Sequence, residues 1–123
     1  MFKFSFLIAA IIFVAIDGIY LNLMKGYFLN QVQKVQNSPI KMNIIATFIC
    51  YIFLITGLNY FIIGPKKSTS DAFLLGLVVY GVYETTNWAL FKNWSMLTVL
   101  IDTLWGGTLF ALTTYIVQKL PIK

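Results

Sequence analysis

The stretch FSFLIAAIIFVAIDGIYLNLM, residues 4–24, decides the fold of this chain. Its single charged side chain is Asp17, and lysines lie directly outside it at Lys3 and Lys25. A helix needs about 20 apolar residues to cross a bilayer, whereas the apolar core of a cleaved signal peptide is about 7–15 residues long. We therefore predict a retained membrane span over residues 4–24.

Three further apolar runs follow, at residues 44–63, 72–91 and 96–117. The chain is 59% hydrophobic and 11% charged, with a mean hydropathy of +0.83. Soluble domains are about 45–50% apolar and about 25% charged. We predict an all-α fold, an integral membrane four-helix bundle, in which residues 1–123 form one multi-pass domain.

The longest polar stretch, residues 26–43, separates the first two spans. Phe28, Val32 and Val35 follow the i, i+4, i+7 spacing of one helix face, and Ser38-Pro39 is expected to end any helix. This pattern fits a short amphipathic helix lying at the membrane interface between spans one and two. An ordinary polar loop fits it equally well.

The charged and sulfur-containing residues narrow the class of protein further. All basic residues are lysines that flank the apolar runs, without the basic face that nucleic-acid binding needs. The single cysteine, Cys50, excludes a disulfide framework, and the chain has no histidine to serve as a base or metal ligand. With cytoplasmic termini, inside lysines slightly outnumber outside ones, so we predict that orientation: Lys3, Lys66, Lys67, Lys119 and Lys123 against Lys25, Lys34, Lys41 and Lys92.

Three acidic residues, Asp17, Glu84 and Asp102, lie inside apolar runs. A charge at the bilayer centre costs about 2.5–3.5 kcal/mol, so such residues usually have a functional role. Each lies seven residues from a span end on the same membrane side. At 1.5 Å per residue this depth is about 10 Å, so we expect the three carboxyl groups to meet in one site.

Polar and small residues share the helix faces of these acids. We predict that Tyr20, Tyr80, Tyr83, Asn87, Thr98 and Trp105 line the site. Phe28, Val32, Val35, Trp88 and Trp94 are predicted to be interfacial, because tryptophan is enriched at membrane surfaces. The alternative is that the acids and tyrosines form a hydrogen-bond network that only holds the bundle together.

Three segments carry a family resemblance: residues 15–21 (AIDGIYL), 80–87 (YGVYETTN) and 101–106 (IDTLWG). On these the chain resembles a family of small predicted four-span membrane proteins with no assigned function (domain of unknown function 2177). The resemblance implies the four-span topology and marks the same three acids. The chain has Tyr20 where the family often has tryptophan, and Glu84 where it often has aspartate.

These features favour transport: a small homo-oligomer, in contact with membrane lipids, that conducts protons or cations through Asp17, Glu84 and Asp102. A bound cation at the carboxyl groups is possible, with no other cofactor and no assigned metal. A non-catalytic subunit that binds a lipid or protein partner is the first alternative. A small lipid-modifying enzyme is the second, and it is disfavoured because no serine- or cysteine-based nucleophile motif is present.

Overall fold

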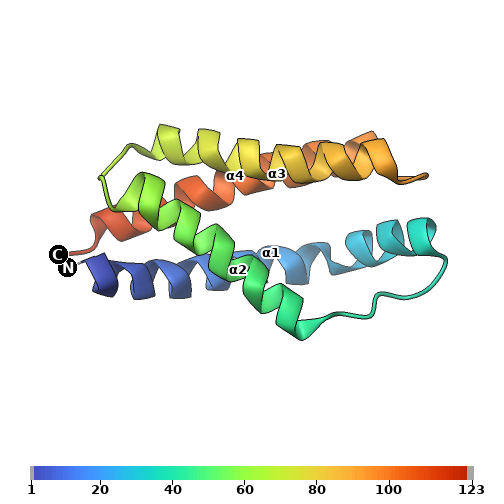
Figure 1. The fold of residues 1–123 in the computed structure, drawn as a ribbon, viewed down its shortest axis with the longest axis horizontal. Coiled ribbons are helices and arrows are strands. Elements are labelled where there is room, and N and C mark those ends of the chain that lie inside the picture. Colours follow the sequence, from blue (N-terminus) through green and yellow to red (C-terminus); the bar gives the residue numbers. More distant parts are fainter. Residues whose placement is uncertain (1, 122–123) are drawn as a thin grey trace.

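The structure is a computed structural model that describes residues 2–121. Its helices are α1 (Phe2–Gln36), α2 (Ile44–Leu58), α3 (Thr69–Leu90) and α4 (Met96–Lys119), and a five-residue π-helix, η1 (Asn59–Ile63), continues α2. Consecutive helices run in opposite directions, with α2 inclined to the other three, and α1 begins at the end of the bundle where α4 finishes (Figure 1). The predicted all-α membrane bundle is confirmed at the level of fold class.

The polar residues between the helices set where each helix begins. The side chains of Asn43, Ser68 and Ser95 each accept a hydrogen bond from a backbone N–H in the first turn of the helix that follows. Such capping satisfies donors that have no partner within the helix. The observed starts at Ile44, Thr69 and Met96 therefore lie within three residues of the predicted spans.

Neither of the two structures considered for residues 26–36, a separate interfacial helix or a polar loop, is correct, because α1 continues unbroken to Gln36. Its 35 residues give a length of about 52 Å, well beyond the hydrocarbon thickness of about 30 Å. Phe28, Val32 and Val35 are half-buried on this extension. The extension packs along the bundle instead of lying flat on the membrane, since Gln31 is buried and bonded to the turn between α3 and α4.

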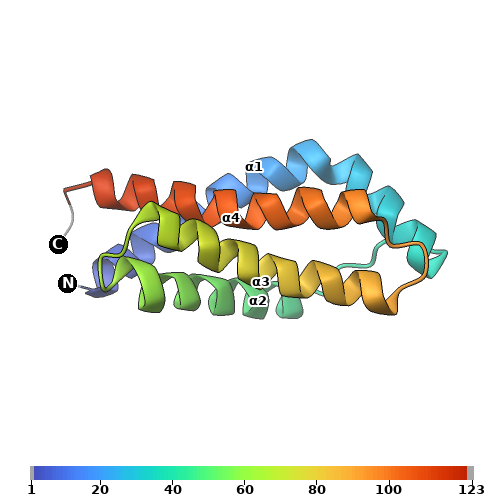
Figure 2. The same cartoon turned by 90° about the horizontal axis from the view of Figure 1, so that it is seen from above.

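Three helical segments are long and apolar enough to cross a membrane on their own: Phe4–Gln36, Ile44–Ile63 and Met96–Lys119. Helix α3 is 22 residues long but carries Glu84, Asn87 and several threonines, which lower its hydropathy. It lies antiparallel along α4 (Figure 2). The fourth crossing is therefore supported by the packing of α3 on α4 and not by its own composition.

Close contact between α3 and α4 depends on three glycines. A Cβ atom added to Gly76 would lie 2.2 Å from the Gly106 carbonyl oxygen and 2.9 Å from the Gly107 Cα. Small residues at such points let membrane helices approach backbone to backbone. This contact fixes the register that sets Glu84 of α3 beside Asp102 of α4.

The interior of the bundle divides into two parts along its axis. The part toward the chain termini, here called the apolar half, is filled by buried hydrophobic side chains: Ala9, Phe13, Leu58, Leu109 and Phe110. The part toward the turn between α3 and α4, here called the polar half, contains buried or half-buried polar ones: Asp17, Gln31, Glu84, Thr98 and Asp102. Every helix also exposes large apolar side chains, which suit contact with lipid.

Candidate functional site

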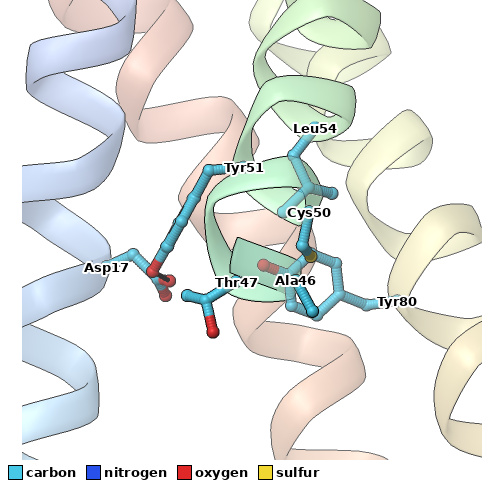
Figure 3. A pocket seen from close by; sticks show the side chains of 7 residues that line it. All are labelled: Asp17, Ala46, Thr47, Cys50, Tyr51, Leu54 and Tyr80. Atoms are coloured by element: carbon cyan, nitrogen blue, oxygen red, sulfur yellow. Dashed lines mark hydrogen bonds between the residues drawn. The ribbon is translucent and has the colours of Figure 1, made fainter. Parts of the chain in front are cut away.

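Asp17 lies innermost in the polar half and is only 6% exposed. The Tyr51 hydroxyl of α2 donates to its Oδ2 at 2.5 Å, and the Trp105 Nε1 of α4 donates to its Oδ1 at 2.9 Å. Figure 3 shows the carboxylate meeting the Tyr51 hydroxyl, while Tyr80 reaches toward them from α3. Three helices thus meet around this one carboxyl group, beside a cavity of about 330 Å³.

Glu84 and Asp102 form a pair one helical turn closer to the turn between α3 and α4. Glu84 is 1% exposed, and its Oε1 accepts a hydrogen bond from the Trp94 Nε1 at 2.9 Å. The Tyr20 hydroxyl donates to Asp102 Oδ1 at 3.4 Å. The carboxyl groups of Glu84 and Asp102 lie close enough to interact with each other. Two neighbouring carboxyl groups favour a state in which one of them carries a proton.

A stacked aromatic pair connects Asp17 to this carboxyl pair. The rings of Tyr20 and Trp105 lie parallel, with centroids 4.3 Å apart. Tyr20 of α1 bonds to Asp102 of α4, and Trp105 of α4 bonds to Asp17 of α1. Asp17 and Tyr20 are three positions apart on α1, as Asp102 and Trp105 are on α4. Three residues correspond to about 4.5 Å along a helix, so the acids lie at two neighbouring levels and not at the single predicted level.

A third polar group lies outside the acids, at the end of the bundle. The Thr98 hydroxyl donates to Gln31 Oε1 at 2.6 Å and is also hydrogen-bonded to the hydroxyls of Tyr27 and Ser95. Gln31 Nε2 donates to the Asn93 carbonyl at 2.9 Å. Thr98, predicted to line the acid site, belongs to this outer group.

The structure sorts the remaining predicted lining residues. Tyr20, Tyr80 and Trp105 lie beside the acids, and Asn87 is buried on the inner face of α3. Tyr83 is 58% exposed and points away from the interior, so its predicted place in the lining is wrong. A shift of one position on α3, from Glu84 to Tyr83, turns a side chain to the outer face.

The two tryptophans predicted to be interfacial differ from each other. Trp88 is 48% exposed, as an interfacial residue would be. Trp94 is half-buried and bonded to Glu84, so it is part of the acid site. The sequence pattern did not predict that Tyr51, Tyr27 and Gln31 take part in the polar half. Tyr51 could have been found, because its hydroxyl group lies in an otherwise apolar span.

Among the described residues, the three acids have no positive partner. Within the part of the chain that the structure describes, no lysine forms an ion pair with an acid, so neither Lys25 nor Lys92 reaches down to neutralise one. Among residues 2–121, no group of three or more acids or cysteines is placed to hold a metal ion. The carboxyl groups are instead held by neutral O–H and N–H donors.

This geometry matches the segments that carried the family resemblance, since Asp17, Glu84 and Asp102 each lie in one of them. A model of a family described as a predicted membrane protein, DUF2177, matches residues 2–118. The chain belongs to the DUF2177 family. No curated protein and no solved structure matches the chain, so DUF2177 membership establishes a membrane protein and assigns it no activity.

Proposed function

We propose that this protein moves protons through its polar half. The observation that carries the proposal is the Glu84–Asp102 pair, two interacting carboxyl groups inside the bundle. Sharing one proton would relieve the repulsion between their charges. Intramembrane carboxyl groups without a fixed cation are the groups that pumps and transporters use as proton relays. Tyr20 and Trp105 link this pair to Asp17, the innermost acid.

Protons are a better cargo for this site than metal cations. Both oxygens of Asp17 already accept hydrogen bonds, and the Glu84 carboxyl group accepts one from Trp94. A hard metal cation needs six to eight oxygen ligands for calcium or a near-ideal octahedron for magnesium. The neutral donors around these acids would have to leave before such a shell formed.

The polar route stops at the apolar half, where Phe13 and Phe110 meet edge to face with ring centroids 5.6 Å apart. In this conformation one chain therefore offers a path from one membrane face to mid-bundle. A complete crossing needs either movement of this aromatic layer or a second copy of the chain, as a homo-oligomer would provide. The first alternative function is a subunit that binds a lipid or protein partner, and the amphipathic residues Phe28, Val32 and Val35 would be its contact surface. These side chains are half-buried on the bundle, which leaves less of them free for such a contact.

The test measures proton entry into proteoliposomes with a trapped pH-sensitive dye, under a potassium gradient set by valinomycin. We expect flux above that of empty vesicles, and a fall of at least about tenfold in Glu84→Gln and Asp102→Asn, because an amide cannot exchange a proton as a carboxyl does. Asp71→Asn, at the exposed start of α3, is the matched control and should keep the parent flux. The proposal fails if the parent gives no flux, or if both interior variants match it while their helical circular dichroism is unchanged.

A further inference from the structure

An open groove runs along the bundle between α2 and α3. Helix α3 packs along α4, whereas α2 packs on α1 and hardly touches α3. Two adjoining cavities of about 330 Å³ and about 410 Å³ occupy the space between them, and both are bordered by Cys50 and Leu54. Each lies within the size range of small-molecule binding sites.

The two ends of the groove differ in chemistry. The smaller cavity has a polar end formed by Asp17, Thr47, Tyr51 and Tyr80 (Figure 3). The larger one is walled by apolar side chains and one glycine, namely Phe53, Leu54, Gly57, Phe61, Leu75, Val79 and Phe110. Along α2 and its continuation η1, residues 47, 50, 54, 57 and 61 are three or four positions apart, so one face of this continuous helical segment supplies both ends.

The polar end contains Asp17, which pairs with no cationic side chain among the described residues. Asp17 accepts two hydrogen bonds, whereas a carboxylate offers about four acceptor sites. The Tyr80 hydroxyl has no hydrogen-bond partner among the described residues, and it projects toward Asp17. The aromatic rings of Tyr51 and Tyr80 also border this end, and such rings attract cations.

We propose that the groove binds a lipophilic ammonium with a single hydrocarbon chain. Its positive head lies at Asp17, between Tyr51 and Tyr80, and its chain lies along Leu54 and Gly57 toward Phe61. Charge complementarity selects the head, and the apolar wall selects the chain. Binding depends on the groove alone, whereas exchange of the bound cation for a proton rests on the proposed function.

The test measures equilibrium binding of radiolabelled dodecyltrimethylammonium to the full chain in nanodiscs of uncharged phospholipid, with empty nanodiscs subtracted. We expect saturable binding that dodecyl sulfate, which has the same chain and the opposite charge, does not displace. Asp17→Asn should weaken binding at least about tenfold, which corresponds to about 1.4 kcal/mol. Glu84→Gln, one level away, should retain binding.

Filling the groove tests the position of the hydrocarbon chain. A Cβ atom at Gly57 meets nothing within 4 Å, so Gly57→Leu should leave the fold intact while its side chain occupies the apolar end. We expect it to weaken binding at least about fivefold. Gly18→Leu is the matched control, because Gly18 also has nothing within 4 Å and lies on α1 away from the groove lining.

Each contrary result overturns a defined part of the inference. Equal displacement by dodecyl sulfate shows that the groove accepts an alkyl chain whatever the charge of its head group. Unchanged binding in Asp17→Asn shows that the charge of Asp17 plays no part. Unchanged binding in Gly57→Leu removes the groove as the site. Absence of saturable binding, with Cys50–Cys50 cross-linking between copies under mild oxidation, shows that a second copy covers the groove instead.

These measurements use no pH gradient, so they separate the two proposals. Saturable binding without proton flux leaves the groove in place and ends the proposed function. Proton flux without saturable binding supports the proposed function and ends the proposal of an ammonium site in the groove.

Discussion

The polar and apolar halves of this bundle are built from the same helices but are held together in different ways. In the polar half, hydrogen bonds between side chains connect helices, as from Trp105 to Asp17 and from Thr98 to Gln31. In the apolar half, buried rings and aliphatic side chains interlock, with Phe13 contacting both Tyr51 and Phe110 edge to face. Hydrogen-bond donors and acceptors therefore decide which helix surfaces meet in the polar half, and the shapes of the side chains decide it in the apolar half.

The apolar half is not free of polar atoms, and these atoms show the contrast most clearly. Asn59 Oδ1, Thr113 Oγ1 and Thr114 Oγ1 are buried there without a hydrogen-bond partner among the described residues. Asn59 begins the π-helix η1, where the Gly64 N–H bonds back to the Asn59 carbonyl at 2.7 Å. In the polar half, by contrast, the buried oxygens of Gln31, Glu84 and Thr98 are bonded, and Thr103 Oγ1 is the exception among the described residues.

The largest expected effect comes from separating the two helices on which the polar half is aligned. In Gly76→Ala, the new methyl group would collide with the Gly106 backbone, which cannot yield as a flexible side chain would. Helices α3 and α4 would have to move apart, which would also separate Glu84 from Asp102. We expect a loss of about 3 kcal/mol in the free energy of unfolding, measured by denaturant titration in detergent micelles.

Gly18→Ala is the control for that measurement, since nothing lies within 4 Å of the added methyl group. It should keep or slightly raise stability, because alanine restricts the unfolded chain more than glycine does. Equal stability of the two variants would mean that the glycine contact does not set the register of α3 on α4.

Much of this fold follows from the sequence alone. The second span was predicted at residues 44–63, which is the combined extent of α2 and η1, and the fourth was predicted to begin at Met96, where α4 starts. Polar capping residues and lysines mark those boundaries directly. The end of α1 could not be found in this way, because its extension is stabilised by Gln31 bonding to Asn93 and Ser95, residues more than sixty positions away.

The site was predictable in part, for a similar reason. The presence of three acids inside apolar runs was visible in the sequence, as was their association with Tyr20 and Trp105. The inward turn of Trp94 depends on the path of a short turn, where Asn93 has a φ of 69°, and helical periodicity says nothing about such a turn. The difference in level between Asp17 and Asp102 depends on how two helices slide along each other, which packing decides.

A smaller effect is expected from releasing the extension of α1. Gln31→Ala removes bonds to the Asn93 carbonyl, the Ser95 N–H and the Thr98 hydroxyl. Interhelical hydrogen bonds in membranes average about 0.6 kcal/mol each, so we expect a local loss of about 2 kcal/mol. The readout is faster amide hydrogen exchange in residues 26–36, with exchange in α3, in α4 and in the rest of α1 unchanged.

Gln33→Ala, at an exposed position on the same segment, should leave that exchange unchanged. If Gln31→Ala also leaves it unchanged, the extension is held by Phe28, Val32 and Val35 rather than by its buried glutamine. Thr98 would then be the outermost residue whose hydrogen bonds stabilise the polar half.

The smallest effects come from one substitution made once in each half, and their sign is the sharpest test of the contrast. Thr98→Val removes a hydroxyl bonded to Gln31, Tyr27 and Ser95, and we expect a loss of about 1 kcal/mol. Thr113→Val removes a buried hydroxyl with no partner among the described residues, so stability should hold or rise by up to about 1 kcal/mol. Valine matches threonine in shape and in β-branching, so packing and helix propensity change little in either case. Both values come from the same thermal unfolding curves in detergent. A loss at Thr113 as large as that at Thr98 would mean that the Thr113 hydroxyl is bonded after all, and that polar contacts hold the two halves together alike.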